Sequence, residues 1–238
     1  MSVRITPAEL GTVLGIWAHP DDEAYLMAGT ALAAVGAGST VACLTATAGG
    51  AGESADEDRW PTARLEEIRR AELAASLAIL GIDDHSYLNL PDGGLTDVDP
   101  AYGVAMVIAA IERVQPDTIL TFGPDGMTGH PDHITVGNWA VKAAASVAGE
   151  RCRVLAATKT PAWIETFADV NEGILVGGEP PCTRVEDLAL EVTLTGAALD
   201  TKVRALKAQA SQTSGLSQAL GEARYSAWVA SEYWTQPI

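Results

Sequence analysis

The sequence predicts an α/β fold with a doubly wound, mostly parallel sheet. Five short apolar runs do not alternate with polar residues, which is typical of strands that are buried on both faces. Segments with helical spacing of apolar residues separate these runs, so strand and helix alternate at least four times. Crossovers in such a sheet are expected to be right-handed, and the arrangement that results is Rossmann-like.

The expected elements follow the chain in this alternating order. The predicted strands are Thr12 to Trp17, Ser39 to Thr45, Ser86 to Leu90, Asp117 to Phe122 and Arg153 to Ala157. The predicted helices are Asp21 to Val35, Thr62 to Leu80, Pro100 to Val114 and Pro131 to Ala148. The second helix shows the clearest helical period, with apolar side chains at Leu65, Ile68, Leu73, Leu77 and Leu80.

Beyond Pro161 the pattern becomes rich in turns, including Gly177-Gly178-Glu179-Pro180-Pro181. A helical stretch from Gly196 to Gln212 and an aromatic tail follow. Because no linker or change in composition marks a second domain, we expect one domain over residues 1–238. Residues 1–150 would form its motif-bearing α/β core, and residues 160–238 a C-terminal extension of the same domain.

Composition excludes several classes of protein. The 31 acidic and 15 basic residues leave a formal net charge of -16, which repels nucleic acid and anionic lipid. Cys43, Cys152 and Cys182 suggest neither a disulfide scaffold nor a thiolate zinc cage. The segment from Met1 to Thr12 lacks the apolar stretch of a secretory signal, and Ala24 to Gly38 is too weakly hydrophobic to span a bilayer. We expect a cytoplasmic protein without nucleic-acid or membrane partners, and homo-oligomers stay open.

Two short motifs hold three of the four histidines. They are His19-Pro20-Asp21-Asp22-Glu23 and His130-Pro131-Asp132-His133, and each follows a predicted strand. Ligands of parallel sheets collect beyond the carboxyl ends of the strands, where both motifs would lie. In each motif two candidate ligands stand three residues apart, and histidine and aspartate are common zinc ligands. The pairing predicts a metal hydrolase.

Each motif also has a plain structural interpretation. Proline at the first helical position and acids in the first turn are typical of a helix start, but that does not account for His19. The residues alone leave one alternative for the metal: His19, Asp22, His130 and His133 could all bind one zinc ion and close it as a structural site. Catalysis needs an open coordination position.

The two motifs together resemble those of the PIG-L/LmbE-like N-acetylglucosaminyl deacetylases, which are zinc hydrolases. The resemblance rests on Ala18 to Glu23 and Gly129 to His133, and it covers about the first 150 residues. Weaker matches are Thr45-Ala46-Thr47, Glu53, Arg69, Glu72, Leu80-Gly81 and Pro91-Asp92-Gly93-Gly94. Thr128 and Gln209 depart from residues common in the family, which leaves the identity of the sugar open.

The resemblance implies a role for each matching residue. His19, Asp22 and His133 would bind one zinc ion per chain, Asp21 would be the general base, and His130 would polarise the substrate carbonyl. Arg69 and Asp92 would contact the substrate, although ion pairing on a solvated helix and turn formation are the competing interpretations. Asp132 is either a carboxylate that orients a neighbouring histidine or an ordinary helix-start acid.

The expected function is therefore zinc-dependent removal of the N-acetyl group from an N-acetylglucosamine-type sugar or glycoconjugate, releasing acetate and a free amine. Either Asp21 or His130 would protonate the departing amine. A metal-dependent phosphoesterase is one alternative, but two-metal versions need more carboxylates than these motifs supply. A non-catalytic zinc-binding protein is another, although a pure binding site has no use for a base at Asp21.

Overall fold

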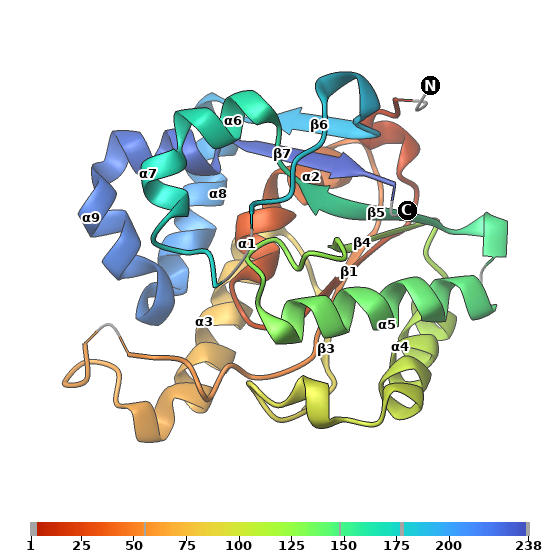
Figure 1. Cartoon of the computed structure of the whole chain (residues 1–238), viewed down its shortest axis with the longest axis horizontal. Helices are drawn as coiled ribbons and strands as arrows, with labels where there is room; N and C mark the ends of the chain where they lie inside the picture. Colours follow the sequence, from red (N-terminus) through yellow and green to blue (C-terminus); the bar gives the residue numbers. More distant parts are fainter. Residues whose placement is uncertain (1–3, 55, 148, 177–178, 237–238) are drawn as a thin grey trace.

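A single seven-stranded sheet runs through the described part of the computed structural model, which comprises residues 4–54, 56–147, 149–176 and 179–236 (Figure 1). Its strand order is β3-β2-β1-β4-β5-β7-β6. The strands are β1 (Val13–Trp17), β2 (Val41–Thr45), β3 (Asp84–Tyr87), β4 (Thr118–Phe122), β5 (Arg153–Thr158), β6 (Leu190–Thr193) and β7 (Ser231–Thr235). Strands β1 to β5 are parallel, and β7 runs antiparallel to both β5 and β6. The predicted mostly parallel sheet is confirmed.

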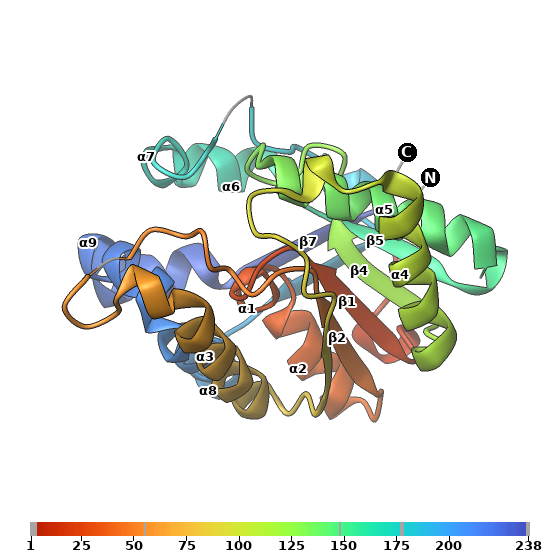
Figure 2. The same ribbon diagram turned by 90° about the horizontal axis from the view of Figure 1, so that it is seen from below.

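Helices cover both faces of the sheet, as predicted. They are α1 (Asp22–Leu26), α2 (Ala28–Gly36), α3 (Leu65–Leu80), α4 (Pro100–Val114), α5 (Pro131–Val147), α6 (Pro161–Thr166), α7 (Ala168–Asn171), α8 (Gly196–Ala208) and α9 (Ala210–Val229). Figure 2 shows α4 and α5 on one face and α2, α3 and α8 on the other. Strand order reverses between β1 and β4, which is where α/β sheets of this kind bind ligands.

The first predicted helix, Asp21 to Val35, is in fact two helices that meet at Met27. A distant carboxylate explains the break. Glu232 of β7 accepts hydrogen bonds from the backbone N–H groups of Gly29 and Thr30, both at 2.7 Å. These donors belong to the first turn of α2 and have no partner within that helix. The contact spans about 200 residues of sequence, so helical periodicity could not reveal it.

The predicted helix from Gly196 to Gln212 is also divided, into α8 and α9. Gln209 separates them with φ -99° and ψ 46°. Ser211, in the first turn of α9, donates from its backbone N–H and its hydroxyl to Glu72 of α3, at 2.9 and 2.6 Å. Side chains of other elements therefore set where α8 ends and α9 begins.

The C-terminal part is more ordered than the sequence predicted. Helices α6 and α7 and strand β6 lie in the segment that was expected to be turn-rich, and the aromatic tail forms β7. Trp234 is fully buried and donates to the Thr30 hydroxyl at 2.9 Å. The third predicted strand starts two residues earlier than expected, at Asp84. The Gly177-Gly178 turn and the predicted helix end at residue 148 lie outside the described residues.

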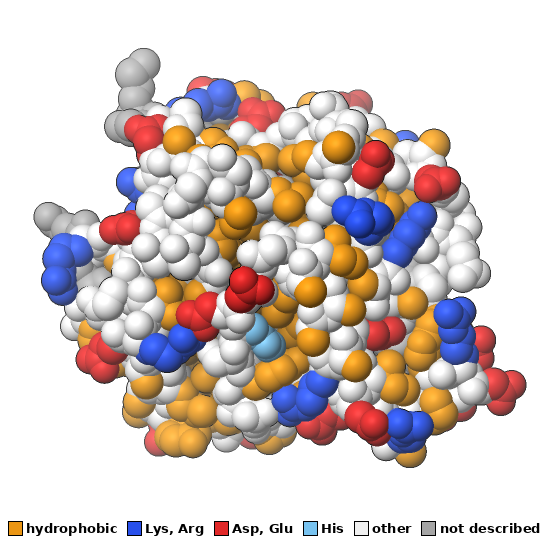
Figure 3. Space-filling view, turned by 180° about the vertical axis from the view of Figure 1, so that it is seen from behind, with side chains coloured by type: hydrophobic (Ala, Val, Ile, Leu, Met, Phe, Trp, Pro, Cys, Tyr) orange, Lys and Arg blue, Asp and Glu red, His pale blue; other side chains and the backbone are white. Residues whose placement is uncertain are grey.

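Two clusters of buried side chains support this arrangement. The larger one packs helices of both layers against the sheet, and the smaller one lies under α6, α7 and α9 with Trp163, Phe167, Tyr225 and Trp228. None of the helices in the described ranges combines the length and the apolar character needed to cross a bilayer. On the face drawn in Figure 3, acidic and basic side chains are interspersed with apolar ones.

Candidate metal centre

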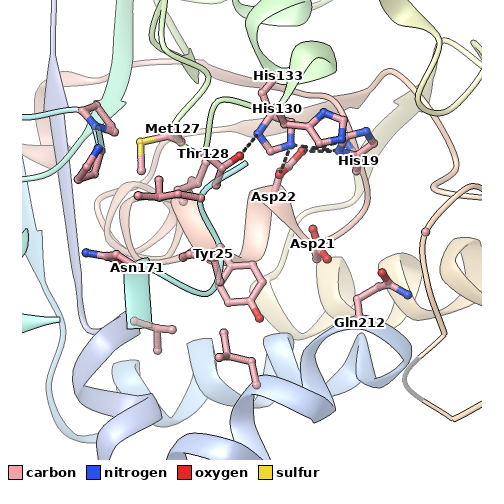
Figure 4. Close-up of a pocket in the computed structure, with 18 of the residues that line it drawn as sticks. His19, Asp21, Asp22, Tyr25, Met127, Thr128, His130, His133, Asn171 and Gln212 are labelled. Carbon is pink, nitrogen blue, oxygen red and sulfur yellow. Dashed lines mark hydrogen bonds and ion pairs between the residues drawn. The ribbon is translucent and has the colours of Figure 1, made fainter. Parts of the chain in front are cut away.

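The two histidine motifs meet at the carboxyl ends of neighbouring strands. His19 lies two residues beyond β1, and His133 lies in the first turn of α5, which follows β4. Because β1 pairs with β4, the two motifs are brought side by side. The His19 and His133 ring centroids are 5.1 Å apart, and Figure 4 shows both rings with His130 and Asp22 on one wall of a cavity.

Two imidazole nitrogens and the Asp22 carboxylate converge within this group. His19 Nδ1 is 3.1 Å from His133 Nε2, His133 Nε2 is 3.4 Å from Asp22 Oδ1, and His19 Nδ1 is 3.8 Å from Asp22 Oδ2. A tetrahedral zinc ion with bonds of about 2.0–2.1 Å separates its ligand atoms by about 3.3 Å. The two nitrogens and the carboxylate therefore have about the spacing of one side of such a coordination shell.

Hydrogen bonds show which ring nitrogens carry protons. His133 Nδ1 lies 2.9 Å from the Gly126 carbonyl oxygen, which can only accept, so the lone pair of His133 is on Nε2. His19 Nε2 lies 3.1 Å from Asp92 Oδ1 and 3.3 Å from Asp132 Oδ2, so its lone pair is on Nδ1. Two nitrogen lone pairs and one carboxylate thus face a common point. Such a donor set is suited to a cation.

The two histidines of this group have opposite pKa shifts. Burial lowers the pKa of His133 to about 3, so its ring is neutral and offers the lone pair on Nε2. Burial also acts to lower the pKa of His19, but hydrogen bonds to Asp132 and Asp92 outweigh it and raise that pKa to about 10. Without a metal the His19 ring is therefore protonated at neutral pH, and a metal ion would bind there in place of the Nδ1 proton.

Asp132 and Asp92 hold His19 from its outer side. Asp132 accepts from the backbone N–H groups of Gly93 and Leu95, at 2.8 and 3.1 Å. Asp92 accepts from the Thr47 hydroxyl at 3.1 Å and from the Ala51 N–H at 2.7 Å. His19, Asp92 and Asp132 could themselves group around a cation. Because their carboxylates are already engaged by protein donors, we interpret them as residues that orient the His19 ring.

These contacts bear on the roles predicted for Asp132 and Asp92. Asp132 contacts His19 Nε2, and its orienting role stays a prediction. Asp92 was predicted to contact substrate, but its carboxylate contacts His19 and Ala51 of the glycine-rich loop from Gly49 to Gly52, and its side chain is 13% exposed. It lines the cavity as well, so substrate contact stays a prediction.

Asp21 stands beside the converging ligand atoms without being one of them. It has φ 95°, which is rare for a residue other than glycine and is typical of strained positions at functional sites. Its backbone N–H donates to Glu23 Oε2 at 3.0 Å, and Arg69 Nη2 lies 3.5 Å from its Oδ2. Burial raises the pKa of Asp21 to about 7. A carboxylate in this state can accept a proton near neutral pH.

Arg69 is directed mainly at the protein. Its Nη1 donates to the Gly49 carbonyl at 3.0 Å and its Nη2 to the Pro20 carbonyl at 2.6 Å. Gly49 has φ 70°, and a Cβ there would lie 2.4 Å from Arg69 Cζ, so the close approach requires glycine. Arg69 thus joins the glycine-rich loop to the first histidine motif. It also lines the cavity, and its predicted contact with substrate stays a prediction.

His130 differs from His19 and His133 in its hydrogen bonding. Its Nδ1 accepts from the Asp132 backbone N–H at 3.1 Å, so a neutral ring carries its proton on Nε2. Burial and the neighbouring His19 and His133 lower the pKa of His130, which favours that neutral form. Ligand atoms of the three histidines lie within 4.8 Å of one another, so a fourfold metal site stays geometrically open.

Sequence reasoning assigned no role to Glu23, which is fully buried behind Asp21. Its Oε1 accepts from Gln209 at 2.6 Å and from the Ser76 hydroxyl at 3.4 Å. Burial raises the pKa of Glu23 to about 8. The one signal in the sequence was Gln209, noted only as a departure from the family. Its contact with Glu23 joins the C-terminal extension to the backbone of Asp21.

The site opens into a cavity of about 500 Å³, within the range of about 300–1,000 Å³ that is usual for small-molecule sites. Beyond the histidines and carboxylates, its wall includes Tyr25, Lys159, Trp163, Asn171 and Trp228. Figure 4 shows Tyr25 and Asn171 farther along the cavity from the three histidines. Sequence reasoning also overlooked Lys159, which follows β5 without any recognisable motif.

Fold and site together define an α/β protein with a histidine–carboxylate centre at the switch point of its sheet. Residues 14–144 match the family model described as PIG-L: GlcNAc-PI de-N-acetylase. The chain belongs to this family, which confirms the resemblance found in the motifs.

Individual proteins extend the comparison. A 1D-myo-inositol 2-acetamido-2-deoxy-alpha-D-glucopyranoside deacetylase of Kineococcus radiotolerans is 30% identical over 189 residues, which are 64% of this chain and 52% of the relative. The chain thus spans about half the length of this curated relative.

Solved structures share the fold. The N,N'-diacetylchitobiose deacetylase of Pyrococcus horikoshii superposes with a TM-score of 0.61 at 23% identity, over 86% of this chain and 71% of that one. The 4-carboxy-2-hydroxymuconate hydratase GalB of Pseudomonas putida superposes with a TM-score of 0.65 at 18% identity, over 96% and 97%. Because the fold also carries a hydratase, function has to be argued from the site.

Proposed function

We propose that this protein is a zinc-dependent N-deacetylase, which hydrolyses the acetamide of an N-acetylglucosamine-type sugar or glycoconjugate to acetate and a free amine. One observation carries the proposal: His19 Nδ1, His133 Nε2 and the Asp22 carboxylate converge within 3.1–3.8 Å, with Asp21 beside them. Membership of the PIG-L family and the acetamido sugar named for the Kineococcus relative support the substrate class.

His19, Asp22 and His133 would hold the zinc ion. When bound, the ion supplies a Lewis acid that lowers the pKa of a coordinated water from about 15.7 towards about 7. Three protein ligands leave a coordination position open for chemistry, and Asp92 and Asp132 keep the His19 ring in its ligating orientation.

Asp21 would take the proton from the attacking water. Its pKa of about 7 suits a general base that works near neutral pH. His130 would donate from Nε2 to the carbonyl oxygen as negative charge develops there, because its Nδ1 is already engaged by the Asp132 N–H. The departing amine then receives the proton held by Asp21 or the one on His130.

A screen of N-acetylated sugars and glycosides for released primary amine tests this function. It is run on the metal-loaded protein, after chelation and after return of zinc, with phosphate monoesters assayed in parallel. We expect amine release that chelation abolishes and zinc restores, with about one zinc ion per chain by elemental analysis. Phosphate-ester hydrolysis alone would indicate a phosphoesterase. Bound zinc without any turnover would support a closed structural site that includes His130.

A further inference from the structure

Lys159 enters the cavity wall at the carboxyl end of β5. Its side chain is buried, with 9% of the residue exposed, and Nζ lies 4.2 Å from the centroid of the Trp163 ring. Among the described residues, no carboxylate or carbonyl oxygen accepts a hydrogen bond from this Nζ. The ammonium group thus has an aromatic face as a neighbour but no anionic partner.

The other buried lysine, Lys202, differs from Lys159 because it has hydrogen-bond partners. Lys202 is fully buried and donates to Glu232 and to the Tyr25 carbonyl. The Glu232 carboxylate also accepts hydrogen bonds from the backbone N–H groups of Gly29 and Thr30 at the start of α2. Burial, reinforced by Lys202, lowers the pKa of Lys159 to about 7. A buried cation without a partner destabilises the folded state, so packing alone does not explain why a lysine occupies this position.

Three nitrogen atoms in residues of the cavity wall also lack hydrogen-bond partners in the described part of the chain. Trp163 Nε1, Asn171 Nδ2 and Trp228 Nε1 are all buried and have no hydrogen-bond partner among the described residues. All three residues line the same cavity as Lys159, and each can only donate through these atoms. The carboxylates of Asp21 and Asp22 line the same cavity. The cavity wall therefore carries acidic groups at the metal centre and the amine of Lys159 beside Trp163.

A ligand complementary to this cavity would present its acetamide to the metal centre and an acceptor with negative charge to Lys159. The ring of Trp228 packs against those of Tyr25 and Trp163, with centroids 5.5 and 6.3 Å apart, and all three residues line the cavity, which therefore has an aromatic wall. Aromatic walls favour flat or apolar groups over polar ones.

We propose that Lys159, Trp163 and Asn171 form an aglycone subsite, which selects N-acetylated glycosides whose aromatic or apolar aglycone carries an oxyanion. Carboxylate and phosphate share the required chemistry. The inference rests on the proposed deacetylase function, because that function places the acetamide at the metal centre of the same cavity. The family model ends at residue 144, before these residues begin, so the subsite belongs to the part of the chain beyond that match.

Matched glycosides of N-acetylglucosamine test the subsite. The probes carry 4-carboxyphenyl, 4-carbamoylphenyl or 4-phosphooxyphenyl aglycones, so shape is nearly constant and charge changes. We expect kcat/KM for the carboxylate or the phosphate probe to exceed that for the neutral amide by about tenfold, and their order distinguishes the two anions. The net charge of -16 would by itself disfavour both anionic probes, so this preference must come from a local cation.

Variants assign the preference to a residue. Lys159→Met should reduce the ratio of anionic to neutral kcat/KM to about one, and Lys159→Arg should retain most of it. Lys142→Met, on the exposed side of α5, is the matched control and should keep the wild-type ratio. A ratio near one in the wild type, or one that Lys159→Met leaves intact, overturns the subsite while the deacetylase function stands.

A binding measurement separates the two proposals. Calorimetric titration with the de-N-acetylated 4-carboxyphenyl and 4-carbamoylphenyl glucosaminides needs no turnover. Tighter binding of the carboxylate that depends on Lys159, without hydrolysis of any acetylated probe, would retain the subsite and refute the deacetylase. Equal binding of the two compounds, or binding of neither, overturns the subsite.

Discussion

Asp21→Asn separates the proposed base from the proposed metal ligands. Asparagine matches aspartate in shape and tolerates positive φ, so the backbone at φ 95° is retained. The Asp21 N–H bond to Glu23 does not involve the side chain that is changed. The Asp21 carboxylate makes only a long contact with Arg69, at 3.5 Å, and it is not one of the three converging ligand atoms. We therefore expect zinc to stay bound and the fold to persist.

The rate should fall steeply in this variant. General-base catalysis contributes about 10²–10⁴-fold, which corresponds to about 3–5 kcal/mol in the activation free energy. The assay combines zinc content by elemental analysis with release of primary amine from the best N-acetylated substrate. Loss of zinc in Asp21→Asn would make Asp21 a ligand, and a rate within about threefold of the wild type would remove it as the base.

Three further sets of variants test other parts of the structure. His133→Ala should lose both zinc and activity, whereas His130→Ala should keep zinc and lose rate; equal loss of metal in both would support fourfold coordination. Gly49→Ala places a Cβ 2.4 Å from Arg69 Cζ at φ 70°, so kcat/KM should fall by about tenfold or more, while Gly36→Ala, whose Cβ meets nothing within 4 Å, should match the wild type. The pKa of Lys159 is about 7 in the folded protein, which is below the pKa of a lysine in the unfolded chain. Between about pH 7 and pH 10 the unfolded state therefore binds more protons than the folded state. The contribution of Lys159 to the free energy of unfolding then rises with pH. Denaturant unfolding should show wild type gaining on Lys159→Met from pH 7 to pH 9.5, and a difference that does not change with pH would contradict the burial of an unpaired amine.

Helix α4 shows how far local pattern reaches. The predicted range, Pro100 to Val114, is the range observed, because proline after Asp99 marks its start and the Asp99 carboxylate caps it through the Ala101 N–H at 2.9 Å. All the signals for this helix lie within one turn of its ends. The start of α2 has no such signal, since its cap, Glu232, comes from β7.

The same contrast applies to the site. Residue identity and spacing were enough to select His19, Asp22, His130 and His133 as candidate ligands and to predict that they lie at strand ends. Both predictions need only short segments of sequence, because ligand chemistry depends on residue type and parallel topology on the order of strands and helices. The sequence did not predict the hydrogen bonds of Arg69 with Gly49 and Pro20, or the contacts of Asp92 with His19 and Ala51. Each of these contacts joins segments that meet only after the sheet has formed.

Lys159 is the clearest case of what folding alone decides. In the sequence it is a single lysine after an apolar run, and a solvated position would be the ordinary expectation. Pairing of β5 with β7, together with packing of α6 and α9, buries it against Trp163 in the wall of the cavity. Local pattern thus specified the class of fold and the family motifs and predicted the metal site, since these depend on residue type and short spacing. The helix breaks, the hydrogen bonds behind the histidines and the part of the cavity wall around Lys159 depend on contacts between distant segments, which exist only in the folded chain.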